Sequence, residues 1–303
     1  MLPTIKLGSL EVTRLIIGGN PFSGNSHVNE SLSEAMRDYF TTARIKETLF
    51  RCEEYGINTM QLRGDAHIMR MIREYRAEGG TMKWIGQTAT EFLSFENNVR
   101  QMVKAGADAI YHHGSSTDKL FLAGDLATLR DRLKILRDTG LPVGLCTHIP
   151  EVIRYSEENG WDVDFYMGCV YNISRKEKGY DEFRAACGAG NDQPDTTIYD
   201  VAGASSGIHD VAGPDGALSG EPFYDSDIPV MYDRIRKTSK PCLAFKILGA
   251  TRRFSSQETV RAAFHEAFRE IKPTDGVIVG MFPKDLDQVR LNTGYVREAL
   301  GVE

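Results

Sequence analysis

Short apolar runs alternate along the chain with longer stretches in which apolar residues recur at helical spacing. Runs of about four to eight apolar residues between polar loops are typical of strands buried on both faces, as in parallel sheets. The predicted strands cover residues 15–19, 58–62, 82–87, 109–113, 142–147, 164–171, 242–248 and 276–281.

The stretches between these runs are predicted to be helices. Residues 42–55, 92–105 and 123–138 have helical spacing, and Gly56, Gly106 and Gly140 follow as left-handed caps. Strands that alternate with helices pair in parallel through right-handed crossovers. The pattern predicts a single α/β domain over 1–303, a (β/α)8 TIM barrel, with a doubly wound open sheet as the structural alternative.

One segment, at about 173–226, interrupts this alternation. It contains a possible helix at 178–187 and precedes a predicted helix at 227–238. Long loops are uncommon unless they are functional or disordered. Because this insertion leaves the carboxyl end of the sixth barrel strand, we expect it to lie over the active-site face. The alternative is an insertion without a role.

Composition narrows the class of partner. The formal net charge of −6 gives no sign of the basic surface typical of nucleic-acid binding. We find no apolar run long enough to span a membrane, and the N-terminus lacks the pattern of a signal peptide. The five cysteines are scattered and without CxxC spacing, which favours reduced thiols. We therefore expect a cytoplasmic protein that binds a small-molecule substrate.

Polar side chains gather where the predicted strands end. In a TIM barrel, the carboxyl ends of the strands carry the active site. Three of the seven histidines, His112, His113 and His148, fall at such ends. The polar residues at these positions are Asn20, Gln61, Arg63, Asp65, Gln87, His112, His113, Cys146, His148, Cys169, Tyr171, Asn172 and Lys246.

Two stretches resemble the aldo-keto reductases: LGSLEVTRLIIGGNPFSG at 7–24, and the C-terminal quarter with AFKILG at 244–249 and DLDQVRLN at 285–292. The resemblance implies an N-terminal β-hairpin before the barrel and bound NAD(P). It implies that Phe245 stacks on the nicotinamide and that Gln288 and Asn292 contact the adenine. Gly249 and Arg252 would then lie near the phosphates. The alternative is that these are ordinary barrel-mouth and helix-surface residues.

The catalytic residues of that family are mostly missing. The family uses a tyrosine acid, tuned by a lysine that pairs with an aspartate, and a histidine that orients the carbonyl. His113 matches the histidine. Gln61 replaces the aspartate, Gln87 or Thr88 replaces the lysine, and no tyrosine lies near Asp65. Without a tuned acid, hydride transfer loses a factor of about 10²–10⁴, so this is not a standard aldo-keto reductase.

The leading hypothesis is a divergent enzyme that works beside NAD(P) on a small, carbohydrate-like carbonyl or hydroxyl compound. His113 or His112 would act as the acid–base catalyst, with Asp65 or Tyr171 as its partner. The predicted substrate contacts are Asn20, Gln61, Gln87, His148 and Lys246.

Three alternatives remain open. His113, His148 and Asp65 could bind a divalent metal, as in sugar isomerases, epimerases or lyases. Lys246 could form a Schiff base. It follows Phe245, however, and consecutive side chains of a strand point to opposite faces unless the strand ends there. The third alternative is a binding or regulatory barrel without catalysis.

Overall fold

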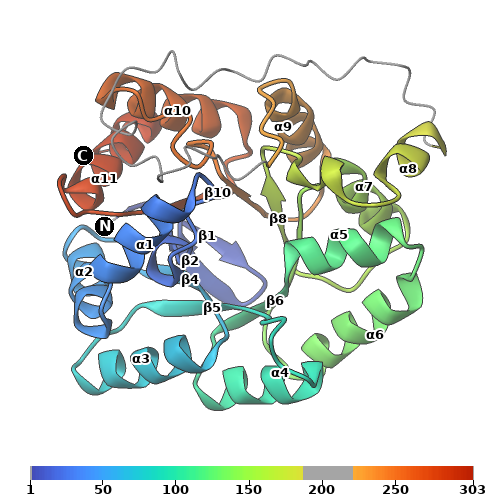
Figure 1. Cartoon of the computed structure of the whole chain (residues 1–303), viewed down its shortest axis with the longest axis horizontal. Coiled ribbons are helices and arrows are strands. Elements are labelled where there is room, and N and C mark those ends of the chain that lie inside the picture. The colour runs from blue at the N-terminus through green and yellow to red at the C-terminus, as the bar shows by residue number, and fades with distance from the viewer. Residues whose placement is uncertain (1, 187–220, 303) are drawn as a thin grey trace.

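The computed structural model describes residues 2–186 and 221–302 of the chain. Parallel strands close into a barrel in the order β10–β3–β4–β5–β6–β7–β8–β9, and helices surround it (Figure 1). The predicted TIM barrel is confirmed, and each predicted run overlaps one barrel strand. These are β3 (Leu15–Gly18), β4 (Thr59–Arg63), β5 (Lys83–Gln87), β6 (Ala109–His112), β7 (Val143–Thr147), β8 (Phe165–Cys169), β9 (Cys242–Phe245) and β10 (Gly276–Gly280).

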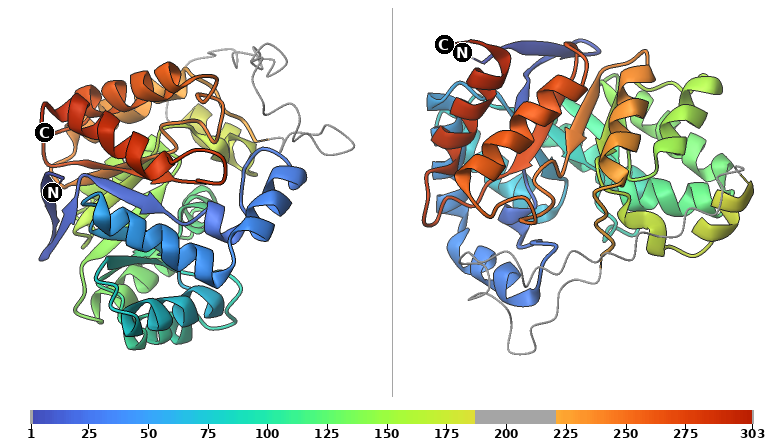
Figure 2. Two further views of the ribbon diagram at one scale, coloured as in Figure 1. Left: turned by 90° about the vertical axis from the view of Figure 1, so that its left-hand side faces the viewer. Right: turned by 90° about the horizontal axis from the view of Figure 1, so that it is seen from above.

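An N-terminal hairpin of β1 (Thr4–Leu7) and β2 (Leu10–Thr13) precedes the barrel, as the resemblance implies. Its buried side chains Ile5, Leu7 and Val12 belong to the same apolar cluster as Phe165 and other residues inside the barrel. The hairpin therefore closes the amino end of the barrel. Figure 2 shows α1 (Glu30–Tyr39) at the opposite end, where the strands have their carboxyl ends. We call that end the mouth.

Side chains alternate between the inside and the outside of the barrel wall, as the pleat of a strand requires. Ile85, Tyr111 and Met167 pack inside, whereas their neighbours Trp84 and Ile110 pack against the helices. Among the described residues, the barrel interior is a packed core below the mouth, so a ligand inside the barrel would lie at the mouth.

The helices that link consecutive strands follow the prediction closely. Gly56, Gly106 and Gly140 have φ values of +82°, +88° and +76°, which confirms the left-handed caps. No helix in 2–186 or 221–302 is long and apolar enough to cross a membrane. The linking helices are α2 (Thr42–Glu54), α3 (Ala66–Ala77), α4 (Phe95–Lys104), α6 (Leu126–Arg137), α7 (Pro150–Glu158), α9 (Asp227–Lys237), α10 (Gln257–Glu270) and α11 (Gln288–Leu300).

Two further helices, α1 and α5 (Gly114–Leu122), follow the first and fourth barrel strands and are additions to the prediction. α5 begins directly at the end of β6, so its first residues lie at the mouth. Asn29 caps α1 by accepting a hydrogen bond from the Leu32 N–H, at 2.8 Å. Both helices therefore shape the mouth rather than the outer layer alone.

Much of the predicted insertion, residues 187–220, lies outside the described residues. Its described ends are the short helix η2 (Ile173–Lys176) with α8 (Tyr180–Ala186), and residues 221–226 before α9. Asp227, the first residue of α9, accepts a hydrogen bond from the Asn172 N–H at 2.9 Å and forms an ion pair with Arg175. The chain that follows β8 and the chain that enters α9 are therefore held together at Asp227.

Candidate active site

A buried aspartate–histidine pair lies at the mouth. Asp118 on α5 is fully buried, and its Oδ2 lies 2.7 Å from Nδ1 of His148, just after β7. The carboxylate also accepts hydrogen bonds from the hydroxyls of Thr147 and Ser174, the latter at 2.7 Å, and from the His148 N–H at 3.1 Å. Because a carboxylate only accepts, Nδ1 carries the ring proton, and Nε2 is left as a proton acceptor.

Close packing of α5 against β7 makes this pair possible. A Cβ atom at Gly114, the first residue of α5, would lie 2.9 Å from Cys146 Sγ and 3.1 Å from His148 Cε1. Only glycine fits there without a shift of its neighbours. The glycine therefore lets α5 approach β7 closely enough for Asp118 to reach His148.

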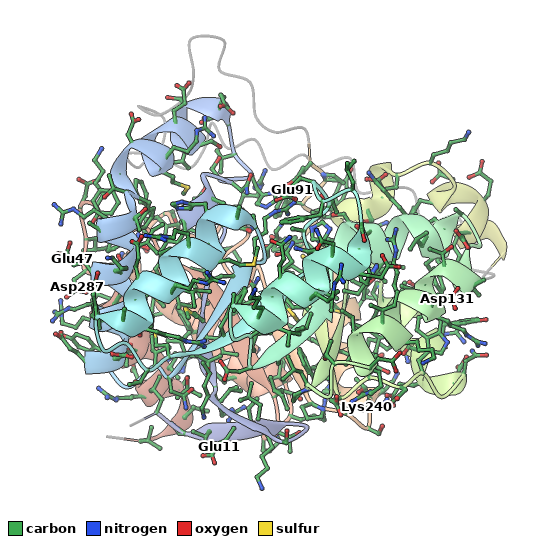
Figure 3. All side chains as sticks on the ribbon, turned by 90° about the horizontal axis from the view of Figure 1, so that it is seen from below. Glu11, Glu47, Glu91, Asp131, Lys240 and Asp287 are labelled. Atoms are coloured by element: carbon green, nitrogen blue, oxygen red, sulfur yellow. The ribbon has the colours of Figure 1, made fainter. Side chains whose placement is uncertain are left out.

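His113 lies beside this pair, and the structure makes it a neutral imidazole. Its backbone N–H donates a hydrogen bond to the Thr88 hydroxyl oxygen at 3.0 Å, and its Nδ1 lies 3.4 Å from Ser116 Oγ. Burial, followed by the positive charge of Arg63, lowers its pKa to about 4. Arg63 forms an ion pair with Glu91, which Figure 3 labels at the mouth end of the barrel. At neutral pH, His113 can orient a substrate oxygen but carries no charge.

Gln61, Gln87 and Tyr111 form the floor of the mouth. Gln61 Nε2 donates to Tyr111 Oη at 2.6 Å, and Tyr111 Oη donates to Gln87 Oε1 at 2.9 Å. Burial raises the pKa of Tyr111 well above its ordinary value. This tyrosine therefore stays protonated, in contrast to the tuned tyrosine acid of the aldo-keto reductases.

A pocket of about 630 Å³ lies between the ends of β3, β9 and β10, bounded by α1 and by the first turns of α10 and α11. The Phe245 ring, in its lining, meets the ring of His148 edge-on at 5.7 Å between centroids. The pocket and the aspartate–histidine pair are thus neighbours. Five predicted site residues line it: Asn20, Gln61, Phe245, Lys246 and Gln288.

A second polar cluster lies in this pocket. Lys246 Nζ is 3.5 Å from Nδ1 of His27. This Nδ1 atom of His27 is in turn 2.7 Å from Oε2 of Glu221. Nε2 of His27 lies 3.0 Å from Nδ2 of Asn20. The cluster joins the loop after β3, the end of β9 and the chain that returns from the insertion.

Two of the five predicted cofactor residues line the pocket and three do not. Phe245 and Gln288 line the pocket, whereas Gly249, Arg252 and Asn292 are absent from its lining. The Arg252 guanidinium lies over the ring of Phe223, 3.7 Å from its centroid. A Cβ at Gly249 would lie 3.0 Å from the hydroxyl oxygen of Tyr171, so this glycine serves close packing. Asn292 is buried on α11.

Three of the predicted catalytic residues lie apart from the aspartate–histidine pair. His112 is fully buried in the helix layer, where its Nδ1 lies 2.8 Å from Thr117 Oγ1, and burial lowers its pKa to about 3. Asp65 caps α3 through its side chain. Tyr171 donates to Asp225 at 3.2 Å, and burial raises its pKa above its ordinary value. Only His113 of the four predicted catalytic residues neighbours the pair.

The predicted metal ligands do not form a metal site in the structure. Among residues 2–186 and 221–302, no group of three or more His, Cys, Asp or Glu side chains could hold a metal ion. The Asp65 carboxylate caps α3, and Nδ1 of His148 is bound to Asp118.

Sequence reasoning missed Asp118, Ser174, His27 and Glu221. Asp118 lies four residues into a helix that the periodicity did not reveal, and its partner His148 is 30 positions away. His27 and Glu221 are 194 positions apart, so only the closed barrel brings them together. The nearest sequence feature was the set of histidines at strand ends, which identified His148 but not its partner.

Together, the barrel and its polar mouth have the general form of a TIM-barrel enzyme. No family model matches the chain, and no curated protein matches its sequence. A truncated 3-deoxy-D-arabino-heptulosonate 7-phosphate synthase from Thermotoga maritima is similar in structure, with a TM-score of 0.55 and 15% identity over 100% of this chain and 94% of that one. The aldo-keto reductase AKR11C1 from Bacillus halodurans gives a TM-score of 0.49 and 13% identity over 98% and 91% of the two chains. The first likeness shows the shared barrel fold, and neither assigns the chain to a family.

Proposed function

We propose that the protein transfers a hydride between NAD(P) and a small, carbohydrate-like carbonyl or hydroxyl compound, with His148 as the proton acceptor and donor. The buried Asp118–His148 pair beside Phe245 carries this proposal. It places a group that can move a proton next to the ring on which the nicotinamide would stack.

The proton step follows from the geometry of the pair. Nε2 of His148 takes the proton of a substrate hydroxyl during oxidation and returns a proton to the oxygen during reduction. Asp118 holds the ring in the required tautomer and stabilises the imidazolium that forms. Positioned acid–base catalysis of this kind contributes about 10²–10⁴ to a rate. It replaces the tyrosine acid that the sequence lacks.

NAD(P) is the cofactor of this proposal, and the residues of the pocket fit it in part. Phe245 offers a flat ring, and Gln288 offers a side-chain amide whose oxygen already accepts from the Phe282 N–H at 2.7 Å. Ser255 and Ser256 at the start of α10 line the pocket, where backbone N–H groups of a first turn favour phosphate. Bound there, NAD(P) would supply the carbon that accepts or donates the hydride.

The substrate would lie between the floor and His148. The amides of Gln61, Gln87 and Asn20 suit a compound with several hydroxyl groups, since an amide both donates and accepts. His113, neutral and beside the pair, would hold the reacting oxygen.

The test measures cofactor binding and turnover separately. Quenching of protein fluorescence by NADPH and NADH reports binding, and the absorbance of the reduced nicotinamide reports turnover with a panel of sugars, polyols and hydroxyaldehydes. We expect His148→Gln to bind the cofactor normally and to lose turnover by a factor of about 10²–10⁴. His67→Gln, at an exposed position on α3, is the matched control and should leave both unchanged. Absence of binding for both nucleotides would refute the cofactor assignment, and full turnover by His148→Gln would refute the role of the pair.

A further inference from the structure

Backbone strain is concentrated at one pocket. Within 2–186 and 221–302, the non-glycine residues with positive φ are His27 at +59°, Lys246 at +61°, Ala250 at +49° and Thr251 at +79°. All four line the same pocket at the mouth. Left-handed backbone is unfavourable for residues with a Cβ atom, and it persists mainly where function requires it. This clustering directs attention to the side chains that these residues present.

Lys246 owes its position to this strain. β9 ends at Phe245, and the left-handed turn at Lys246 replaces the alternation of an extended strand. Phe245 and Lys246 therefore both line the pocket, although they are consecutive residues. The expectation that these two side chains face apart held only if the strand continued past Phe245. Because β9 ends at Phe245, that condition is not met, and the objection to Lys246 as a reactive group falls.

We propose that Lys246 is an amine nucleophile that captures small hydroxylated aldehydes or ketones as a Schiff base in this pocket. This activity is additional to hydride transfer and does not require NAD(P) or His148.

The surroundings of Lys246 favour the neutral amine. The face of the Phe223 ring, whose centroid is 5.4 Å from Nζ, attracts the charged amine, but among the described residues Nζ forms no ion pair with a carboxylate. Burial lowers the pKa of the lysine, which leaves more of the nucleophilic form at neutral pH. The charged or titratable groups around it are Cys169, Glu221, Arg252, Cys146 and His27. Arg252 lowers its pKa further, whereas Cys169, Glu221 and Cys146 raise it.

Schiff-base formation needs one proton to move from nitrogen to oxygen, and His27 is placed to carry it. The lone pair on Nζ forms a bond to the carbonyl carbon, and the electron pair of the C=O bond moves to the oxygen. Nδ1 of His27 carries the ring proton against Glu221 at rest. It first passes this proton to that oxygen, and the nitrogen so freed, 3.5 Å from Nζ, then takes one from Nζ. The nitrogen lone pair then forms C=N while the C–O bond breaks. Solvent supplies the second proton that lets the oxygen leave as water, and the product is the protonated Schiff base. Glu221, 2.7 Å from the same ring nitrogen, stabilises the imidazole while protons move.

Reductive trapping tests the proposal directly. The protein is incubated with dihydroxyacetone and sodium borohydride near neutral pH, and peptide mass spectrometry locates the modified lysines. Hydride from the reagent reduces the C=N bond to a stable secondary amine, which adds the mass of dihydroxyacetone less one oxygen atom. We expect one dominant adduct, at Lys246.

Lys240→Met provides the matched control. Lys240 precedes the same strand at the opposite end of the barrel, where Figure 3 shows it on the side of Glu11 and the hairpin. Lys246→Met should lose the dominant adduct, whereas Lys240→Met should keep it. Thermal melting of both variants checks folding, and the adduct map of the unaltered protein does not depend on either variant.

Two results would overturn the proposal. One is modification of Lys246 that is no greater than that of Lys240 in the unaltered protein. The other is an undiminished adduct yield in folded Lys246→Met. Since trapping uses no nucleotide, its outcome is separate from that of the hydride-transfer test: His148→Gln should lose turnover with NAD(P) and still form the adduct.

Discussion

Replacement of Asp118 by asparagine changes the proton on His148 without changing the size of the side chain. Asp118 faces donors on every side: Nδ1 and N–H of His148, and the hydroxyls of Thr147 and Ser174. An asparagine has one acceptor oxygen and one NH₂ group in place of the two carboxylate oxygens. If the NH₂ group lies toward His148, Nδ1 must become an acceptor and the ring proton moves to Nε2.

Two magnitudes follow for Asp118→Asn. Nε2 with a proton cannot accept one from a substrate hydroxyl, so turnover should fall by a factor of about 10²–10⁴. Each buried donor that loses its acceptor costs about 1–3 kcal/mol of folding free energy. We therefore expect a folded protein of reduced stability, with cofactor binding retained and the oxidation rate most affected.

The assay combines turnover with NMR of the histidine ring nitrogens, which reports the tautomer of His148 whatever the substrate is. Ser174→Ala is the control, because it removes one donor to Asp118 and leaves the contact with Nδ1 in place. It should keep both the tautomer and most of the turnover. Asp118→Asn with the original tautomer and unchanged turnover would refute the reasoning.

Two further predictions concern stability and binding. Burial lowers the pKa of His112 to about 3 from 6.5. As the pH falls, the unfolded chain therefore takes up a proton at this residue before the folded chain does. The free energy of unfolding should fall by about 2 kcal/mol between pH 7 and pH 5 for this reason. Urea denaturation should show a flatter pH dependence for His112→Gln, and an equal slope would contradict the assignment. Phe245→Ala should weaken NADPH binding by about threefold to tenfold through the lost ring contact, measured by fluorescence titration. Unchanged affinity would place the nicotinamide elsewhere.

The barrel was predictable because hydrophobic burial acts on every strand in the same way. Each apolar run became a strand, and the glycines after the helices took the left-handed backbone that the sequence predicts. The hydrophobic pattern records which segments are covered on both faces. It contains little about side chains that meet through polar contacts, so Asp118 was not recognised as the partner of His148.

The alternation of side chains along a strand explains where the two neighbouring histidines of the site lie, and it stops where the strand ends. His113 follows Tyr111 by two positions and lies on the same inner side, whereas His112 points into the helix layer. Strict alternation separates the two histidines, although both end the same predicted strand. At Lys246 alternation does not apply, because β9 ends at Phe245 and Lys246 has left-handed backbone. The alternation of side chains holds only as far as the strand extends. The hydrophobic pattern does not show which residue is the last of the strand.

The Asp227 junction gives the barrel freedom to vary its insertion. The contacts of this carboxylate with Asn172 and Arg175 fasten the outgoing and returning chain together. A change in the number of residues between Arg175 and Asp227 would therefore leave the spacing of β8 and α9 as it is. Evolution or design could vary the length of chain there, provided that Ser174 and Glu221, which support the two polar clusters, stay with the barrel.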